Sequence, residues 1–295
     1  MKKAIFQLNI AVFLAGFTAI LGKLISLQEG VLVVYRLLLT VLALAMIFLI
    51  KKKPVLIPFK SLVPVFGVGA VIAFHWLTFY GSVKYANISV AVVCLSASGF
   101  FTSFLEPLIL KRRIRFMEVF LGMLAIAGVY IIFDFHPYFK TGILFGILAS
   151  VGSSLFPIFN KRLITTYDAS LLTFYEMAGG AVFLMVCMPL YLHYFPATSF
   201  IPTGQDWIWL ILLSVVCTVY CFDLQLTALK KLSPFTANLM YNLEPVYGII
   251  LAFIFFKENK FLNIHFYIGL LLIILAVVLQ IGMVYGTRKR PYVLK

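Results

Sequence analysis

Charged residues are scarce in this chain. Of its 295 residues only 12% are charged, while 63% are hydrophobic; a soluble domain carries about 25% charged and about 45–50% apolar residues. A soluble protein of this composition would expose large apolar patches, so the composition excludes an ordinary cytosolic enzyme. Aromatic residues reach 16%, which excludes a disordered chain, because such chains are poor in aromatic and β-branched residues. The sequence therefore predicts an integral membrane protein.

Cysteine and histidine are also few, with four of each. All four cysteines lie inside apolar runs, and no cysteine pair in an exterior loop or Cys/His cluster predicts a disulfide or a metal site. A phosphate-binding GxxxxGK[ST] loop and a zinc-binding HExxH motif are absent from the sequence. We therefore expect no cofactor, no metal and no ATP-driven pumping.

Acidic residues are outnumbered, with 10 Asp and Glu against 24 Lys and Arg and a net charge of +14. In a soluble protein this excess suggests nucleic acid. Here the basic residues form short clusters between apolar runs, at 51–53, 111–113 and 288–290. Such clusters orient a polytopic protein against an anionic cytoplasmic surface. We expect the lipid bilayer, and no nucleic acid, as a partner.

The apolar residues form ten segments long enough for a membrane span, which needs about 20 residues. β-Barrel strands would alternate over about ten residues, and these runs are continuous. The predicted fold class is all-α integral membrane, with ten transmembrane helices. The segments are residues 4–25, 31–50, 62–84, 88–110, 117–134, 141–160, 169–192, 207–229, 234–256 and 262–286.

The first segment resembles a signal peptide, because Lys2 and Lys3 precede an apolar stretch. Gln7 and Asn9 interrupt that stretch, and a second span follows at once. We therefore expect a retained helix.

The positive-inside rule predicts the orientation. With the N-terminus inside, 18 basic residues fall on the cytoplasmic side and 4 on the other. Both termini are predicted to be cytoplasmic, in a multi-pass protein of the plasma (bacterial inner) membrane.

The two halves of the chain show weak similarity at a spacing of 146 residues. The matched pairs are Lys84 and Lys230, Ala91 and Ala237, Leu105 and Leu251, and Lys111 and Lys257. Five spans per half is an odd number, so residues 1–137 and 138–295 would form two repeats of inverted orientation, as in many secondary transporters. The alternative is that apolar helices resemble each other by composition.

Several stretches resemble the drug/metabolite transporter superfamily, in particular the EamA-type transporters. They are His75-Trp76 to Lys84-Tyr85-Ala86, Ala228-Leu229-Lys230 running into Tyr241-Asn242-Leu243-Glu244-Pro245, and Lys257-Glu258. The resemblance implies a ten-helix bundle with a central cavity lined mainly by the third, fourth, eighth and ninth helices. It also implies amino acids and related metabolites as substrates.

Glu244 is the sharpest polar candidate, about ten residues into its span and followed by Pro245. Ionisable residues in a span are costly and default to functional candidates. Asn238, Tyr241 and Asn242 precede it at helical spacings, so this segment predicts substrate binding, with Glu244 also a proton carrier. The alternative is a protonated glutamate that holds two helices together.

Two further acids are candidates for proton coupling. Glu176 lies beside Gly179 and Gly180, where close helix approach can seat it against a partner. Asp223 lies on a face with Lys230, and a local ion pair is the alternative for it.

His75, Trp76 and Tyr80 in the third span predict an aromatic wall with polar handles, which suits an amphipathic small molecule. Ser98 is a further candidate ligand on the fourth span, although serines in spans more often pack helices. A structural histidine is the alternative for His75. Arg36 is predicted to snorkel to the outer interface, and attraction of an anionic group is the alternative for it.

The leading function is secondary transport of a small metabolite, an amino acid or related compound, by alternating access and in the direction of export. Efflux of amphipathic drugs is the alternative within transport, and protons are a possible second partner. A membrane-embedded transferase is a remote alternative, because the acids are scattered singly over separate spans, and a channel is a third. The chain is not expected to be an enzyme, and its oligomeric state is left open.

Overall fold

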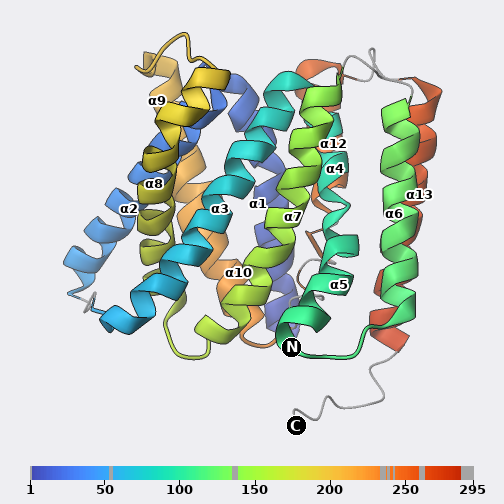
Figure 1. The fold of residues 1–295 in the computed structure, drawn as a ribbon, viewed down its shortest axis with the longest axis horizontal. Coiled ribbons are helices and arrows are strands. Elements are labelled where there is room, and N and C mark those ends of the chain that lie inside the picture. The colour runs from blue at the N-terminus through green and yellow to red at the C-terminus, as the bar shows by residue number, and fades with distance from the viewer. Residues whose placement is uncertain are drawn as a thin grey trace.

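The computed structural model of the chain is a bundle of helices (Figure 1). It describes residues 2–52, 56–134, 139–232, 237, 240–241, 243–258 and 263–286. The elements are α1 (Lys2–Leu24), α2 (Glu29–Lys51), α3 (Phe59–Tyr85), α4 (Ile88–Leu95), α5 (Ser98–Leu110), α6 (Phe116–Asp134), α7 (Lys140–Leu163), α8 (Ala169–Tyr194), α9 (Gly204–Ser214), the π-helical η2 (Val215–Tyr220), α10 (Cys221–Leu229), α12 (Glu244–Phe256) and α13 (Ile264–Gly286).

Within these described residues, seven helical stretches are long and apolar enough to cross a membrane, and three more apolar helices are shorter. Large apolar side chains also face outward, among them Leu49 at 78%, Leu108 at 76% and Phe116 at 90% exposure. Water would make such a surface costly, whereas lipid tails solvate it. The prediction of an all-helical multi-pass membrane protein is confirmed, and ten crossings stay a prediction.

Polar residues define where several helices begin. The Gln28 side chain accepts hydrogen bonds from the first backbone N–H groups of α2, at Gly30 and Val31. Asn87 caps α4 in the same way through the N–H of Val90 at 2.7 Å. Such caps satisfy donors that a helix leaves free at its start.

The predicted fourth span is two helices, not one. α4 ends at Leu95 and α5 begins at Ser98. Between them the N–H groups of Ser96 and Ala97 bond to carbonyls three residues back, on Val93 and Cys94, which tightens the turn. The span predicted over residues 88–110 is present as the apolar stretch Ile88–Leu110, with this tightened turn in its middle.

The second half contains a helix that matches α5 in length and position. α12 and α5 are both 13 residues long, and their first residues, Glu244 and Ser98, lie 146 residues apart. Each ends at a lysine in the left-handed conformation, Lys111 with φ 53° and Lys257 with φ 52°. The sequence spacing of 146 thus recurs in the helix boundaries.

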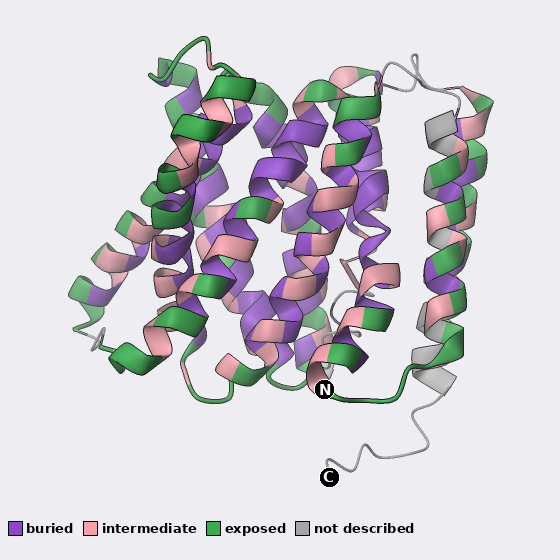
Figure 2. Ribbon diagram, viewed as in Figure 1, coloured by how far each residue is buried: buried purple, intermediate pink, exposed green. Residues whose placement is uncertain are grey.

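Buried residues run along α1 and α4 in the middle of the bundle (Figure 2). Glycines bring α7 close to this core. A Cβ atom added to Gly142 would lie 2.5 Å from the Cβ of Ala86, and one added to Gly146 would lie 2.5 Å from the Cβ of Cys94, so neither position has room for a side chain. Small residues on α7 thus allow it to pack closely against its neighbours. α6 and α13 pack side by side on one flank (Figure 1).

Candidate functional site

A small cavity of about 70 Å³ lies inside the bundle. Both halves of the chain line it, and four of the predicted site residues are among the lining residues. The residues that line it within the described part of the chain are Ala15, Thr18, Arg36, Ile72, His75, Trp76, Phe79, Leu95, Ser153, Phe156, Cys217, Cys221, Phe222, Gln225, Tyr241 and Glu244.

Arg36 is the centre of this site and is only 2% exposed. Its Nε donates to Thr218 Oγ1 at 2.9 Å and a terminal nitrogen donates to the Tyr80 hydroxyl at 2.7 Å. The guanidinium carbon lies 3.5 Å from the centroid of the Trp76 ring. Aromatic faces and hydroxyls therefore replace water around this cation.

The prediction that Arg36 snorkels to the interface is therefore wrong. The residue sits seven positions inside α2, which begins at Glu29. Helix α3 and the η2 segment supply enough polar and aromatic groups to hold the charge inside the bundle. Snorkelling is favoured only where such partners are missing.

The π-helical η2 segment brings its polar groups to Arg36. Thr218 Oγ1 accepts the hydrogen bond from Arg36 Nε. The same hydroxyl donates to the carbonyl of Leu213, five residues earlier, at 2.9 Å. The Cys217 carbonyl accepts a second, longer bond of 3.5 Å from the guanidinium. π-Helical turns within α-helices are frequent at functional sites, and nothing in the sequence pattern marks this one.

Glu244 supplies the opposite charge. It is the first residue of α12, is 8% exposed and lines the same cavity as Arg36, with which it interacts electrostatically. Pro245 fits directly behind it, because the first turn of a helix needs no backbone donor. A cation and an acid thus face one cavity from the two halves of the chain.

Aromatic rings form the apolar wall. Trp76 and Phe222 meet edge to face with centroids 5.8 Å apart, and Phe156 lies 5.2 Å from Phe222. Tyr241 reaches the wall from the second half, with its hydroxyl 3.9 Å from Cys221 Sγ. The cavity can therefore hold an apolar group between its charged residues.

His75 makes the backbone contact of a structural histidine, and its role in substrate binding stays a prediction. Its Nδ1 lies 2.7 Å from the carbonyl oxygen of Ala149, which orients the ring as a structural histidine, and the residue also lines the cavity. In the neutral tautomer that donates from Nδ1, the Nε2 atom is an acceptor. This assignment follows from the hydrogen bond.

The other predicted binding residues differ in position. Tyr80 is not in the lining but holds Arg36 through its hydroxyl. Ser98 starts α5 outside the cavity lining, and its carbonyl accepts from Ser154 Oγ at 2.8 Å. Asn238 and Asn242 lie outside the described residues.

Glu176 and Asp223 also lie apart from the cavity lining. Glu176 is completely buried, where α3 and α8 cross so closely that a Cβ on Gly69 would meet the Glu176 carbonyl. Asp223 accepts a hydrogen bond from Ser170 Oγ at 3.1 Å. Among the described residues no group of three His, Cys, Asp or Glu side chains is placed to hold a metal ion.

Comparisons with known proteins agree with this architecture. The family model described as "EamA-like transporter family" matches residues 2–134 and again residues 140–282. A protein of Clostridium kluyveri, described as an uncharacterized transporter, is 24% identical over 222 residues, which cover 72% of this chain and 68% of that protein. A crystal structure with 16% sequence identity has a TM-score of 0.67 and covers 95% of this chain and 97% of the other. At that identity the structural match shows the fold alone.

Proposed function

Since this chain belongs to the EamA-like transporter family and is thus a membrane transporter, we propose that it moves a small zwitterionic metabolite, such as an amino acid, by alternating access. The family points to a transporter and not to an enzyme. The substrate class, the direction of transport and the mechanism go beyond the family membership and are proposed.

One observation carries the proposal: Arg36 and Glu244 line the same cavity. A buried charge is costly unless a partner compensates it. A zwitterion offers a carboxylate to the guanidinium and an ammonium group to the acid, so it leaves neither charge uncompensated. An amphipathic cation would satisfy Glu244 and be repelled by Arg36, which makes drug efflux the second candidate.

The size of the cavity supports alternating access. Sites for drug-sized ligands enclose about 300–1,000 Å³, whereas this cavity holds about 70 Å³. A substrate therefore needs the bundle to rearrange around it. Transport by rocking two halves about a central site supplies such a rearrangement.

We propose that residues 1–137 and 138–295 are the two halves, related as inverted repeats of five helices. The two separate family matches support this division. The paired helices α5 and α12 support it too, because they share length, spacing and a left-handed end. Breaks in both helices beside the cavity are typical of inverted-repeat transporters.

The location in the plasma (bacterial inner) membrane and the cytoplasmic termini rest on the distribution of 18 basic residues to one side and 4 to the other. Export is the proposed direction, with Glu244 as the proton carrier. An acid that holds a proton in one state and a substrate ammonium group in the other exchanges the two, and an inward proton gradient then drives the substrate outward.

The test is reconstitution of the purified protein into vesicles loaded with unlabelled amino acid. We expect saturable exchange of external radiolabelled zwitterionic amino acids, with little exchange of an amphipathic cation. Preferred exchange of the cation would favour drug efflux. Non-saturable flux would indicate a channel, and a chemically altered substrate would indicate a transferase.

A further inference from the structure

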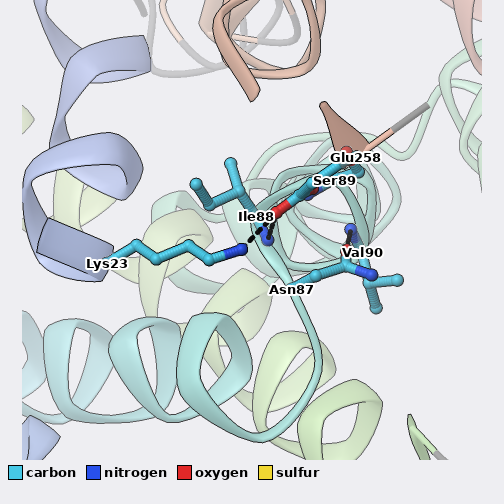
Figure 3. Close-up of polar contacts among 6 residues, drawn as sticks. All are labelled: Lys23, Asn87, Ile88, Ser89, Val90 and Glu258. Atoms are coloured by element: carbon cyan, nitrogen blue, oxygen red, sulfur yellow. Dashed lines mark hydrogen bonds and ion pairs between the residues drawn. The ribbon is translucent and has the colours of Figure 1, made fainter. Parts of the chain in front are cut away.

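Glu258 receives an unusual set of donors at the end of the bundle where α1 ends and α4 begins (Figure 3). Lys23 Nζ lies 2.7 Å from its Oε1. The Ser89 N–H and hydroxyl donate to its Oε2 at 3.0 and 2.7 Å, and the Ile88 N–H donates to Oε1 at 3.3 Å. We call Lys23, Ile88, Ser89 and Glu258 the outer latch.

The latch joins the two halves of the chain. Lys23 is in the last turn of α1, and Ile88 and Ser89 open α4, all within the first half. Glu258 follows α12 in the second half. The carboxylate also lies at the N-terminus of α4, where the helix dipole favours a negative charge.

Helices α1, α4 and α12 connect the latch with the cavity. Ala15 of α1, Leu95 at the end of α4 and Glu244 at the start of α12 all line it. These helices also pack closely at two glycines: an added Cβ on Gly248 would lie 3.0 Å from Val92, and one on Gly22 would overlap the Tyr80 ring.

We propose that Glu258 is a gating residue, whose bonds to α1 and α4 hold the pathway closed on this side of the membrane. The inference rests on the proposed function, because a gate matters only if the cavity opens alternately to two sides. Movement of the end of α12 away from α1 and α4 must break the ion pair and all three hydrogen bonds of Glu258, whereas the bonds of Asp206 on α9 do not involve these helix ends. The latch therefore biases the protein toward the state that is closed at this end.

Burial makes the latch effective. Glu258 is 4% exposed, and Lys23 also lies over the Phe256 ring at 4.6 Å. Exposed ion pairs contribute little, but a desolvated carboxylate that accepts several hydrogen bonds is held much more tightly. Loss of the charge is expected to shift the closed-to-open ratio by about tenfold.

Native cysteines in the cavity provide the readout. Cys217 and Cys221 both line it, so a membrane-impermeant thiol reagent reaches them only when the cavity opens to the side of addition. Intact cells and inside-out vesicles each receive the reagent, and mass spectrometry assigns the labelled cysteine. We expect Glu258→Gln to raise labelling from the latch side about tenfold and to lower it from the opposite side.

Asp206→Asn is the matched control, with the same change from carboxylate to amide. Asp206 also bonds across the halves at this end, to the Ser26 N–H and hydroxyl, both at 2.7 Å. It ties α9 to the loop after α1 and does not touch α4. Its variant is expected to change labelling less than about twofold.

Two results overturn the inference: unchanged labelling in folded Glu258→Gln, or an equal increase in Asp206→Asn. If Glu258→Gln does not fold, Lys23→Gln removes the ion pair and leaves the bonds to α4. This variant must then raise labelling from the latch side, and no increase refutes the gate.

Labelling needs no substrate, so a failure to exchange amino acids would refute the proposed substrate and leave this result intact. Increased labelling from the cytoplasm would refute the predicted orientation but not the latch.

Discussion

The guanidinium of Arg36 stacks on the indole of Trp76, 3.5 Å from the ring centroid. The same guanidinium donates to Thr218 and Tyr80, so groups from two helical segments, α3 and η2, hold one cation of α2 beside the cavity. An arginine fixed in this way presents its remaining N–H groups in a defined direction, as planar recognition of a carboxylate requires. This relationship is the basis of the proposed substrate class.

Arg36→Lys is expected to weaken substrate binding by about tenfold or more, although the charge is kept. Lysine is a point charge without the planar fork and loses the stacking on Trp76. Substrate-induced thermal stabilisation of the purified protein measures the affinity. Leu38→Ala, on an exposed surface of the same helix, is the control and should bind as the wild type does. Equal affinity of Arg36→Lys and wild type would remove Arg36 from the site.

Glu244→Gln is expected to exchange substrate with lower affinity, because the amide oxygen accepts a hydrogen bond from the ammonium group without compensating its charge, and to lose accumulation driven by a pH gradient. Glutamine keeps the shape and hydrogen-bonding capacity of the side chain but does not titrate. Accumulation of labelled amino acid in vesicles, with and without the gradient, measures the difference. Glu176→Gln and Asp223→Asn serve as comparisons because neither residue lines the cavity. Undiminished accumulation in Glu244→Gln would move the proton site to one of these two acids.

Gly69→Ala is expected to destabilise the bundle by about 1–3 kcal/mol or more. The new methyl group would overlap the carbonyl of Glu176, and a backbone atom of α8 cannot move aside as a side chain can. Gly67→Ala is the matched control two residues away on α3, where an added Cβ meets nothing within 4 Å. Thermal unfolding in detergent measures both variants, and equal melting temperatures would contradict the close α3–α8 crossing.

The latch is expected to stay closed at moderately acidic external pH. Burial raises the pKa of the Glu258 carboxyl, but the hydrogen bonds from Lys23 and Ser89 outweigh it and hold the pKa below its ordinary value of 4.5. A lowered pKa stabilises the closed state at higher pH, and this contribution is lost only as the pH falls through that lowered value. Only the thiolate reacts with the reagent, so labelling of Cys217 from the latch side is divided at each pH by that of the unfolded protein, and this ratio should be constant from about pH 5.5 to 8. A rise in this ratio between about pH 7 and 6 would show that another group controls the latch.

The sequence predicts the membrane fold well because apolar length and basic clusters are local properties. The start of α12 at Glu244 is also a local property, since a proline is favoured in the first turn of a helix. The break after Leu95 carries no proline or glycine, so a pattern of apolar residues does not distinguish it from a continuous helix. The matching position 146 residues later, where α12 begins at Glu244, was the feature that could have indicated this break.

Arg36 was misjudged for a different reason. A single arginine near the end of a span is typical of an interfacial anchor, and its partners lie 44 residues away at Tyr80 and 182 away at Thr218. Such contacts depend on how three helical segments pack, which one sequence does not specify. His75, Trp76 and Glu244 line the cavity and could be named from the sequence, because ionisable residues inside spans are costly and tryptophan and histidine are few in this chain.

The most direct test asks whether both halves contribute to one substrate site. Ala15→Cys places a thiol on α1 in the first half, and native Cys221 lies in the second; both positions line the cavity. Labelling of the two thiols by a small permeant reagent is measured with increasing amounts of the amino acid that the vesicles exchange. The account predicts that the substrate protects both thiols with the same half-maximal concentration. Protection of one thiol alone, or of neither in a protein that transports, would contradict it.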